Sequence, residues 1–244
     1  MTYDVIVKGK FVSRPNRFIA NVETDGKTEV VHVKNTGRCK ELLTEGAEVY
    51  LSLGDNPQRK TKYDLVAVKK GDLLINMDSM APNKAAGEYL RKIFGEKAMI
   101  KPEKTYGQSR IDFYAETKDE KWLIEVKGVT LEEKGRALFP DAPTERGVKH
   151  IYELCKAVKE GYKACILFVI QMKGVREFSP NDKTDPEFGK ALRYADKHGV
   201  KIKAIDCIVT PQSMVLDSDV RVVLCSQETS ANISPLSRKL AIIP

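Results

Sequence analysis

Two apolar, strand-like runs near the middle of the chain are each interrupted by an acidic residue. In R-I-D-F-Y-A at 110–115, alternation places Asp112 on the face opposite Ile111 and Phe113. In K-W-L-I-E-V-K-G at 121–128, Glu125 and Lys127 share one face. Burying a charge in an apolar sheet is expensive unless the charge is paired or binds a metal. If the two runs pair as neighbouring strands, both acids converge on one place.

A divalent cation would explain these acids. Mg²⁺ prefers oxygen ligands and is typically held by one or two carboxylates together with substrate phosphate oxygens. We therefore predict that Asp112 and Glu125 bind Mg²⁺ or Mn²⁺ and that Lys127 positions or deprotonates the attacking water. This set of residues is typical of phosphodiester hydrolysis. The alternative is a solvated ion pair on an exposed strand, because Glu-x-Lys is a common pattern.

Glu88 is a candidate third metal ligand from a predicted helix. Asn83 can cap this helix and Gly95 can close it, with Ala86 and Leu90 on the apolar face. Glu88 falls on the polar side. The alternative is that its carboxylate only forms intrahelical ion pairs with its basic neighbours, Lys84, Arg91 and Lys92.

A second predicted helix begins at Thr144, a good N-cap, and ends at Gly161. Arg146, Lys149 and His150 lie together on one of its faces, near its N-terminal end. Backbone N–H groups and the helix dipole favour phosphate there. We expect these residues to contact a DNA backbone or to clamp the transition state. A merely solvated first turn is the alternative.

The first 78 residues are typical of a small β-barrel. Turn signals such as Pro15-Asn16 and Asp25-Gly26 separate short strand-like runs, and one helical turn is expected at 39–43. Strands with one small inserted helix fit an OB-type barrel, a fold that commonly binds oligonucleotides, although SH3-like barrels give similar patterns. The predicted strands cover 5–12, 18–23, 28–33, 47–53, 62–69 and 73–76.

Basic side chains and phenylalanines occur together in the barrel, as on surfaces that bind nucleic acid without sequence preference. We predict that Phe11 and Phe18 belong to the core. The residues expected to bind nucleic acid are Arg14, Arg17, Arg38 and Lys40.

Composition is that of a globular protein, and its basic charge suits a polyanionic partner such as nucleic acid, although many basic enzymes have a similar charge. Hydrophobic residues make up 42%, charged residues 31%, and the net charge is +7. The five cysteines are widely spaced with no CxxC, so we expect buried, reduced thiols and not a zinc site or a disulfide framework. Neither a signal peptide nor a long apolar run is evident, which predicts a cytoplasmic protein with no membrane partner.

Several longer motifs resemble one family, the sugar fermentation stimulation protein A (SfsA) family, over most of the chain. The motifs that carry the resemblance are R-P-N-R-F at 14–18, H-V-K-N-T-G-R-C-K-E-L-L at 32–43, S-R-I-D-F at 109–113, E-V-K-G-V-T-L at 125–131, A-L-F-P-D-A-P-T-E-R-G-V-K-H at 137–150 and T-D-P-E-F-G-K-A-L-R at 184–193.

The resemblance implies an α/β (overall α+β) protein with an N-terminal OB-like barrel and a PD-(D/E)XK nuclease-like α/β domain with a central mixed sheet. We place the barrel at 1–80, the nuclease-like domain at 81–230 and a tail at 231–244. By position, Asp112, Glu125 and Lys127 correspond to the nuclease superfamily's metal-binding and catalytic set, with Glu88 as its helix acid. The chain departs from the expected residues at Lys34, Ile111 and Gly128.

Two functional interpretations follow. The first is a DNA-binding protein without sequence preference that carries a Mg²⁺- or Mn²⁺-dependent nuclease centre. The second is a non-enzymatic DNA-binding regulator of sugar metabolism whose nuclease-like site is inactive. RNA is an alternative to DNA in both. Since no helix-turn-helix or zinc finger is evident, we expect phosphate-dominated, salt-dependent binding.

Overall fold

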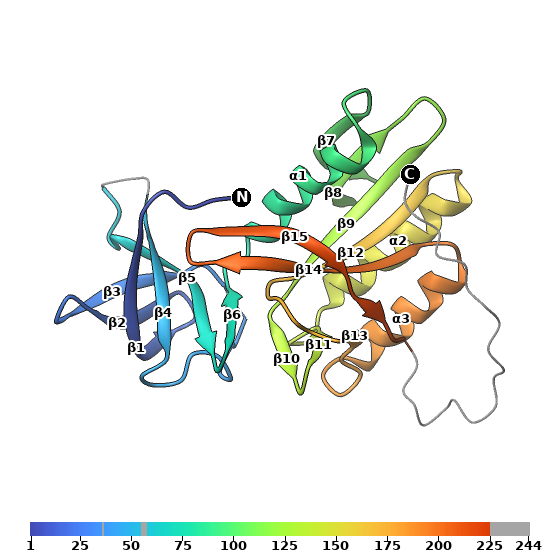
Figure 1. Cartoon of the computed structure of the whole chain (residues 1–244). Helices are drawn as coiled ribbons and strands as arrows, with labels where there is room; N and C mark the ends of the chain where they lie inside the picture. The colour runs from blue at the N-terminus through green and yellow to red at the C-terminus, as the bar shows by residue number, and fades with distance from the viewer. Residues whose placement is uncertain (36, 55–57, 225–244) are drawn as a thin grey trace.

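The N-terminal part of the computed structural model, which describes residues 1–35, 37–54 and 58–224, is a closed β-barrel (Figure 1). Its sheet has the strand order β3-β2-β1-β4-β5-β6, and a parallel pairing of β3 with β5 closes it. The OB-type prediction is confirmed. The strands are β1 (Ile6–Asn16), β2 (Ile19–Thr24), β3 (Lys27–Val33), β4 (Glu48–Leu53), β5 (Tyr63–Lys70) and β6 (Leu73–Asn76).

Alternation along the barrel strands places the apolar side chains inside. In β2, for example, Ala20 and Val22 are fully buried, whereas Glu23, the next residue along the strand, is exposed. Phe11 is buried, as predicted. The prediction that Phe18 belongs to the core is wrong, because this residue lies in the turn between β1 and β2 and is 48% exposed, with the Arg17 guanidinium 5.2 Å from its ring.

The second part of the chain is built on a six-stranded mixed sheet in the order β15-β14-β12-β9-β8-β7. The central strands β9, β12 and β14 are parallel, and the outer strands are antiparallel to their neighbours. This confirms the predicted central mixed sheet. The strands are β7 (Met99–Tyr106), β8 (Ser109–Glu116), β9 (Lys121–Val129), β12 (Lys163–Ile170), β14 (Lys201–Thr210) and β15 (Ser213–Asp219).

Three helices cover this sheet. Helix α1 (Ala81–Phe94) packs on one face, where its Ala85 and Leu90 meet Trp122 and Ile124 of β9. Helices α2 (Glu145–Lys159) and α3 (Pro186–Lys197) cover the other face. Within the described residues no helix is both long and apolar enough to cross a membrane.

Helix α1 begins earlier than the sequence predicts. Its N-cap is Met80, whose side chain makes no capping bond, and a proline occupies the first turn. Proline is favoured there because its fixed φ and missing N–H suit the start of a helix. Asn83 is therefore not the cap, and its side chain is available to the site described below.

A small second sheet, absent from the prediction, lies beside the ends of the central strands, with the order β10-β11-β13-β16. Its strands are too short to give a periodic signal: β10 (Leu131–Glu133), β11 (Arg136–Phe139), β13 (Glu177–Pro180) and β16 (Arg221–Val222). The cysteines at 39, 155, 165 and 207 are buried free thiols. Cys225 and the predicted tail at 231–244 lie outside the described residues.

Candidate active site

Asp112 lies where the β8–β9 ladder ends. The last paired residues are Phe113 and Ile124, and beyond them the Asp112 side chain takes the place of a backbone partner. Its Oδ2 accepts the Val126 N–H at 2.8 Å, and its Oδ1 accepts from Asn83 Nδ2 of α1 at 2.9 Å. Both oxygens are thereby held near Glu125. The predicted alternation does not hold across Asp112, because Ile111 packs with the core beneath α2 and α3 whereas Phe113 packs with the core beneath α1.

Glu125 is almost completely buried, with 3% of the residue exposed. Its Oε1 accepts from Lys127 Nζ at 2.8 Å and lies 2.5 Å from His150 Nδ1. Its Oε2 is buried and has no hydrogen-bond partner in the described part of the chain. Burying a charged oxygen without a hydrogen-bond partner costs free energy of folding. We therefore expect Glu125 Oε2 to have a further partner, such as a bound ion.

The two carboxylates differ in their electrostatics. Burial, and then the neighbouring Glu125 carboxylate, raise the pKa of Asp112 above its usual range, although hydrogen bonds from Val126 and Asn83 oppose the shift. Burial also acts to raise the pKa of Glu125, but His150 and Lys127 together outweigh it, so this pKa lies below its usual range. Glu125 is thus the fixed negative charge of the pair.

His150 is the site residue whose role the sequence misses. It is only 4% exposed, so the prediction that it lies on an exposed basic face is wrong. Its Nε2 lies 3.4 Å from Arg146 Nε, and an arginine nitrogen can only donate a hydrogen bond. His150 Nε2 is therefore the acceptor, so Nδ1 carries the ring proton and donates to Glu125. The spacing of Gly147, His150, Ile151 and Leu154 is that of a buried helical stripe, a signal that could have identified its orientation.

Helix α2 is held in place at its N-terminus. The predicted cap is confirmed: Thr144 Oγ1 accepts the Gly147 N–H at 3.1 Å. The Thr144 N–H in turn donates to Asp185 Oδ2 at 2.8 Å, while Asp185 Oδ1 caps α3 through the Phe188 N–H at 3.0 Å. One aspartate therefore ties the starts of α2 and α3 together, and this fixes the turn that carries His150.

The structure does not bring Glu88 to this site. Its Oε2 lies 2.8 Å from the N-terminal ammonium of Met1, and its side chain is 56% exposed. No group of three His, Cys, Asp or Glu side chains among the described residues is arranged to hold a metal ion. The described site therefore offers two carboxylates, Asp112 and Glu125.

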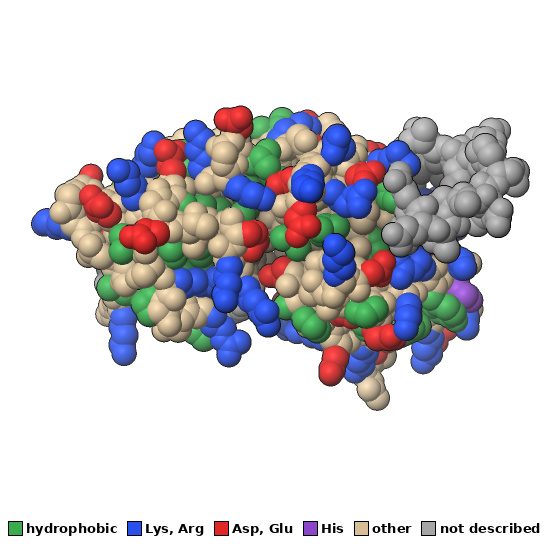
Figure 2. All heavy atoms as spheres, turned by 90° about the horizontal axis from the view of Figure 1, so that it is seen from below, with side chains coloured by type: hydrophobic (Ala, Val, Ile, Leu, Met, Phe, Trp, Pro, Cys, Tyr) green, Lys and Arg blue, Asp and Glu red, His purple; other side chains and the backbone are tan. Residues whose placement is uncertain are grey.

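The other basic residues predicted for the site are either engaged in contacts within the protein or exposed to solvent. The Arg14 guanidinium donates to the carbonyls of Arg17, Asn35, Gly37 and Arg38, so it holds the loop after β3 in place. Lys127 is partly buried by its contact with Glu125. The exposed groups are Arg17, Arg38, Lys40, Arg146 and Lys149. Figure 2 shows Lys and Arg side chains on both sides of the boundary between the barrel and the sheet domain.

Comparisons with known proteins match both parts of the chain. A family model described as the SfsA N-terminal OB domain matches residues 12–77, and one described as the sugar fermentation stimulation protein RE domain matches residues 80–213. A sugar fermentation stimulation protein homolog of Clostridium beijerinckii is 56% identical over 226 residues, covering 92% of this chain and 100% of the relative.

A second homolog, from Desulfitobacterium hafniense, is 59% identical over 215 residues, covering 88% of this chain and 94% of the relative. Among solved structures, that of Pyrococcus furiosus SfsA in complex with Ca²⁺ superposes with a TM-score of 0.80 at 28% identity, covering 91% of this chain and 98% of that one.

Proposed function

The chain belongs to the sugar fermentation stimulation protein (SfsA) family, and from that premise we propose that it binds DNA without sequence preference and cleaves phosphodiester bonds at a metal-dependent centre. The observation that carries the proposal is the unpartnered Oε2 of Glu125, buried beside Asp112. Two carboxylates are what a Mg²⁺ or Mn²⁺ ion that also contacts substrate phosphate requires of a protein. The Pyrococcus furiosus relative was solved in complex with Ca²⁺, which supports a divalent ion as the cofactor of this chain.

In this proposal the residues of the chain have distinct tasks. Asp112 and Glu125 would hold the ion, which when bound polarises the phosphodiester and lowers the pKa of water. Asn83 and the Val126 N–H orient Asp112, and His150 orients Glu125. Lys127, fixed by Glu125 at 2.8 Å, would position the attacking water.

The helix starts around the site suit an anionic substrate. Pro82, at the start of α1, approaches Gly128 at the end of β9, and His150, in the second turn of α2, reaches Glu125 of the same strand. Helix N-termini favour phosphate through their free N–H groups and dipole. Exposed Arg146 and Lys149 on α2 would add phosphate contacts, with Arg17 and Arg38 on the barrel.

One observation favours the second function, a DNA-binding protein with an inactive centre. Both oxygens of Asp112 already accept hydrogen bonds, from Asn83 and from Val126. The carboxylate is therefore satisfied without a metal, as a purely structural acid would be. Each oxygen retains a second lone pair, so these bonds do not themselves prevent metal binding.

Cleavage assays distinguish the two functions. Labelled single-stranded, duplex and flapped DNA and single-stranded RNA are incubated with Mg²⁺, Mn²⁺ or EDTA, using wild type, Glu125→Gln, Lys127→Ala and, as a control for an acid outside the site, Glu88→Gln. We expect metal-dependent products that fall by about 10²- to 10⁴-fold in the first two variants only. Binding, recorded in parallel at two salt concentrations, should persist. Intact substrates in every lane, with salt-sensitive binding, would favour the second function.

A further inference from the structure

A small polar pocket lies at the junction of the two domains, beyond the ends of the parallel strands β9 and β12. Its volume is about 130 Å³, small beside the roughly 300–1,000 Å³ of typical ligand pockets. Such a space accommodates part of one heterocycle but not a base pair. Its walls come from the barrel loop after β3, the start of α1, the end of β9 and the β10–β11 hairpin.

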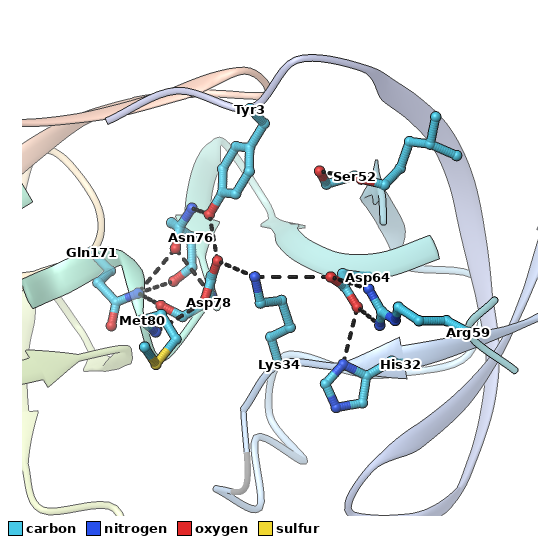
Figure 3. A network of polar contacts seen from close by, with 11 residues as sticks. Tyr3, His32, Lys34, Ser52, Arg59, Asp64, Asn76, Asp78, Met80 and Gln171 are labelled. Atoms are coloured by element: carbon cyan, nitrogen blue, oxygen red, sulfur yellow. Dashed lines mark hydrogen bonds and ion pairs between the residues drawn. The ribbon is translucent and has the colours of Figure 1, made fainter. Parts of the chain in front are cut away.

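Gln171 gives the pocket a fixed hydrogen-bond acceptor. This side chain is 2% exposed, and its Nε2 donates to Asn76 O, Asn76 Oδ1 and Asp78 O at 3.0, 3.1 and 3.2 Å. All three partners are acceptors, so the amide nitrogen must face them and Oε1 must face away. Figure 3 shows this orientation, with the Gln171 oxygen on the side opposite Asn76 and Asp78. Gln171 Oε1 lies close to Gly128, because a Cβ atom at position 128 would be only 2.5 Å from this oxygen.

Further oxygens line the same pocket. The Asp141 carboxylate lies against Gly37, where a Cβ would be 2.5 Å from Oδ2, and no hydrogen bond or ion pair engages it within the described residues. Thr130 and Ser79, which both carry hydroxyl groups, also line the pocket. No Lys, Arg or His of the described part of the chain lines the pocket. With the Asp141 carboxylate and Gln171 Oε1 as acceptors and no cation in the wall, the described lining favours a ligand that presents N–H donors and disfavours phosphate.

Two apolar side chains in the wall and the position of the pocket further restrict the class of ligand it can bind. Phe139 and Pro82 offer flat apolar surface, which suits a planar ring. Gly128 follows Lys127 directly, and Pro82 precedes Asn83, whose side chain holds Asp112. A group in the pocket is thus a close neighbour of a phosphate at the acidic site.

We infer that this pocket binds the Watson–Crick edge of one unpaired base, guanine in preference, adjacent to the phosphate at the proposed metal centre of Asp112 and Glu125. The preference concerns this one unpaired position and adds to phosphate contacts that are independent of sequence. Guanine fits because its N1–H and exocyclic amino group are adjacent donors, which a carboxylate and an amide oxygen can accept. The inference rests on the proposed function, since it assumes a nucleic-acid substrate, but not on cleavage.

The test measures binding in EDTA, so that it is independent of catalysis. A labelled DNA hairpin carries one unpaired position occupied by guanine, by hypoxanthine, which lacks the amino group, or by an abasic residue. For wild type we expect guanine to bind about tenfold more tightly than the abasic hairpin, with hypoxanthine between them. Asp141→Asn and Thr130→Val should reduce this preference, and Asp119→Asn, an exposed acid in the β8–β9 turn, should not.

Each contrary result has a separate meaning. Salt-sensitive binding that is equal for guanine and abasic hairpins would overturn the pocket inference and leave the proposed function intact. A guanine preference that survives unchanged in Asp141→Asn and Thr130→Val would also overturn it. Absence of binding to every hairpin would reject the proposed function together with the inference. Asp141 is exposed, so its substitution should leave the fold intact, which circular dichroism verifies.

Discussion

The His150 side chain is buried, and its Nδ1 contacts Glu125 Oε1, the oxygen that also accepts a hydrogen bond from Lys127 Nζ. Replacing His150 with Ala removes the second donor to Glu125 Oε1 and the whole buried imidazole ring. We expect His150→Ala to lower the free energy of unfolding by about 1–3 kcal/mol, the usual cost of an unsatisfied buried polar group. Urea unfolding measures this. The exposed neighbour Lys149→Ala should change it by less than about 0.5 kcal/mol. Equal effects of the two substitutions would contradict the burial of His150.

At the residue scale the strand acids were predictable and their helical partners were not. Alternation along a strand fixes which residues share a face, and this places Glu125 with Lys127. Asp112 reaches the same place through its bonds to the Val126 N–H and to Asn83. A helical face can be delimited from spacing, but the direction in which it points depends on how the helix packs. Hence His150 was expected to contact DNA together with Arg146 and Lys149, although it is buried against Glu125. Likewise, Glu88 was expected to bind a metal, although it contacts the N-terminal ammonium.

The start of α2 determines where His150 lies. Thr144 Oγ1 accepts the Gly147 N–H, and losing such a cap costs about 1 kcal/mol. We expect Thr144→Ala to reduce stability by this amount in thermal or urea unfolding. Thr144→Ser, which keeps the hydroxyl, should retain most of the stability. A serine variant as unstable as the alanine variant would show that the methyl group, not the cap, is responsible.

Closure of the barrel depends on Asp64, which lies in β5 opposite His32 of β3. Burial acts to raise the pKa of Asp64, but Arg59, His32 and Lys34 outweigh it and hold this pKa below its usual range. An acid whose pKa is lowered by folding stabilises the fold above its unfolded pKa of about 4. That contribution is lost as the pH falls through the lower folded value.

Asp64→Asn should therefore destabilise the protein more at pH 7 than at pH 3. The experiment compares urea unfolding of wild type and variant at the two pH values, with Asp25→Asn in the exposed β2–β3 turn as the control. A difference in unfolding free energy that is the same at both pH values would mean that the ionised carboxylate contributes nothing to barrel closure.

Among the elements, those with a sustained period were predictable from the sequence. The barrel strands, the central strands and α2 and α3 show clear alternation or helical spacing and good caps. The sheet β10-β11-β13-β16 was missed because strands of two to four residues carry no usable period. Helix α1 was predicted to begin too late, since Pro82 within the first turn outweighs Asn83 as a start signal.

Over the whole molecule, the two domains share one core. The buried side chains of the barrel, including Val33 and Met77, are continuous with those beneath α2 and α3, including Val129 and Met172. Polar contacts add to the junction: Lys34 Nζ lies 3.1 Å from Asp78 Oδ2 and 3.8 Å from Asp64 Oδ2 (Figure 3). No periodic pattern predicts such a junction, because it depends on how separate elements meet.

This shared core predicts that the domains unfold together. Fluorescence of Trp122, the single tryptophan, reports on the sheet domain, and far-UV circular dichroism reports on the whole chain. The two urea transitions of wild type should coincide. Lys34→Met leaves the fully buried Asp78 without its cation and should shift both transitions together, by about 1–3 kcal/mol. Exposed Lys69→Met is the control, and separated transitions in wild type would contradict a single unit.

The central claim is that Asp112 and Glu125 form a divalent-metal centre, and calorimetric titration with Mn²⁺ tests it most directly. Wild type should bind one Mn²⁺ at this centre. Glu125→Gln, which keeps the shape of the side chain and removes its charge, should abolish that binding, and Glu88→Gln should leave it unchanged. Mn²⁺ binding that survives in Glu125→Gln, or that disappears only in Glu88→Gln, would contradict the claim.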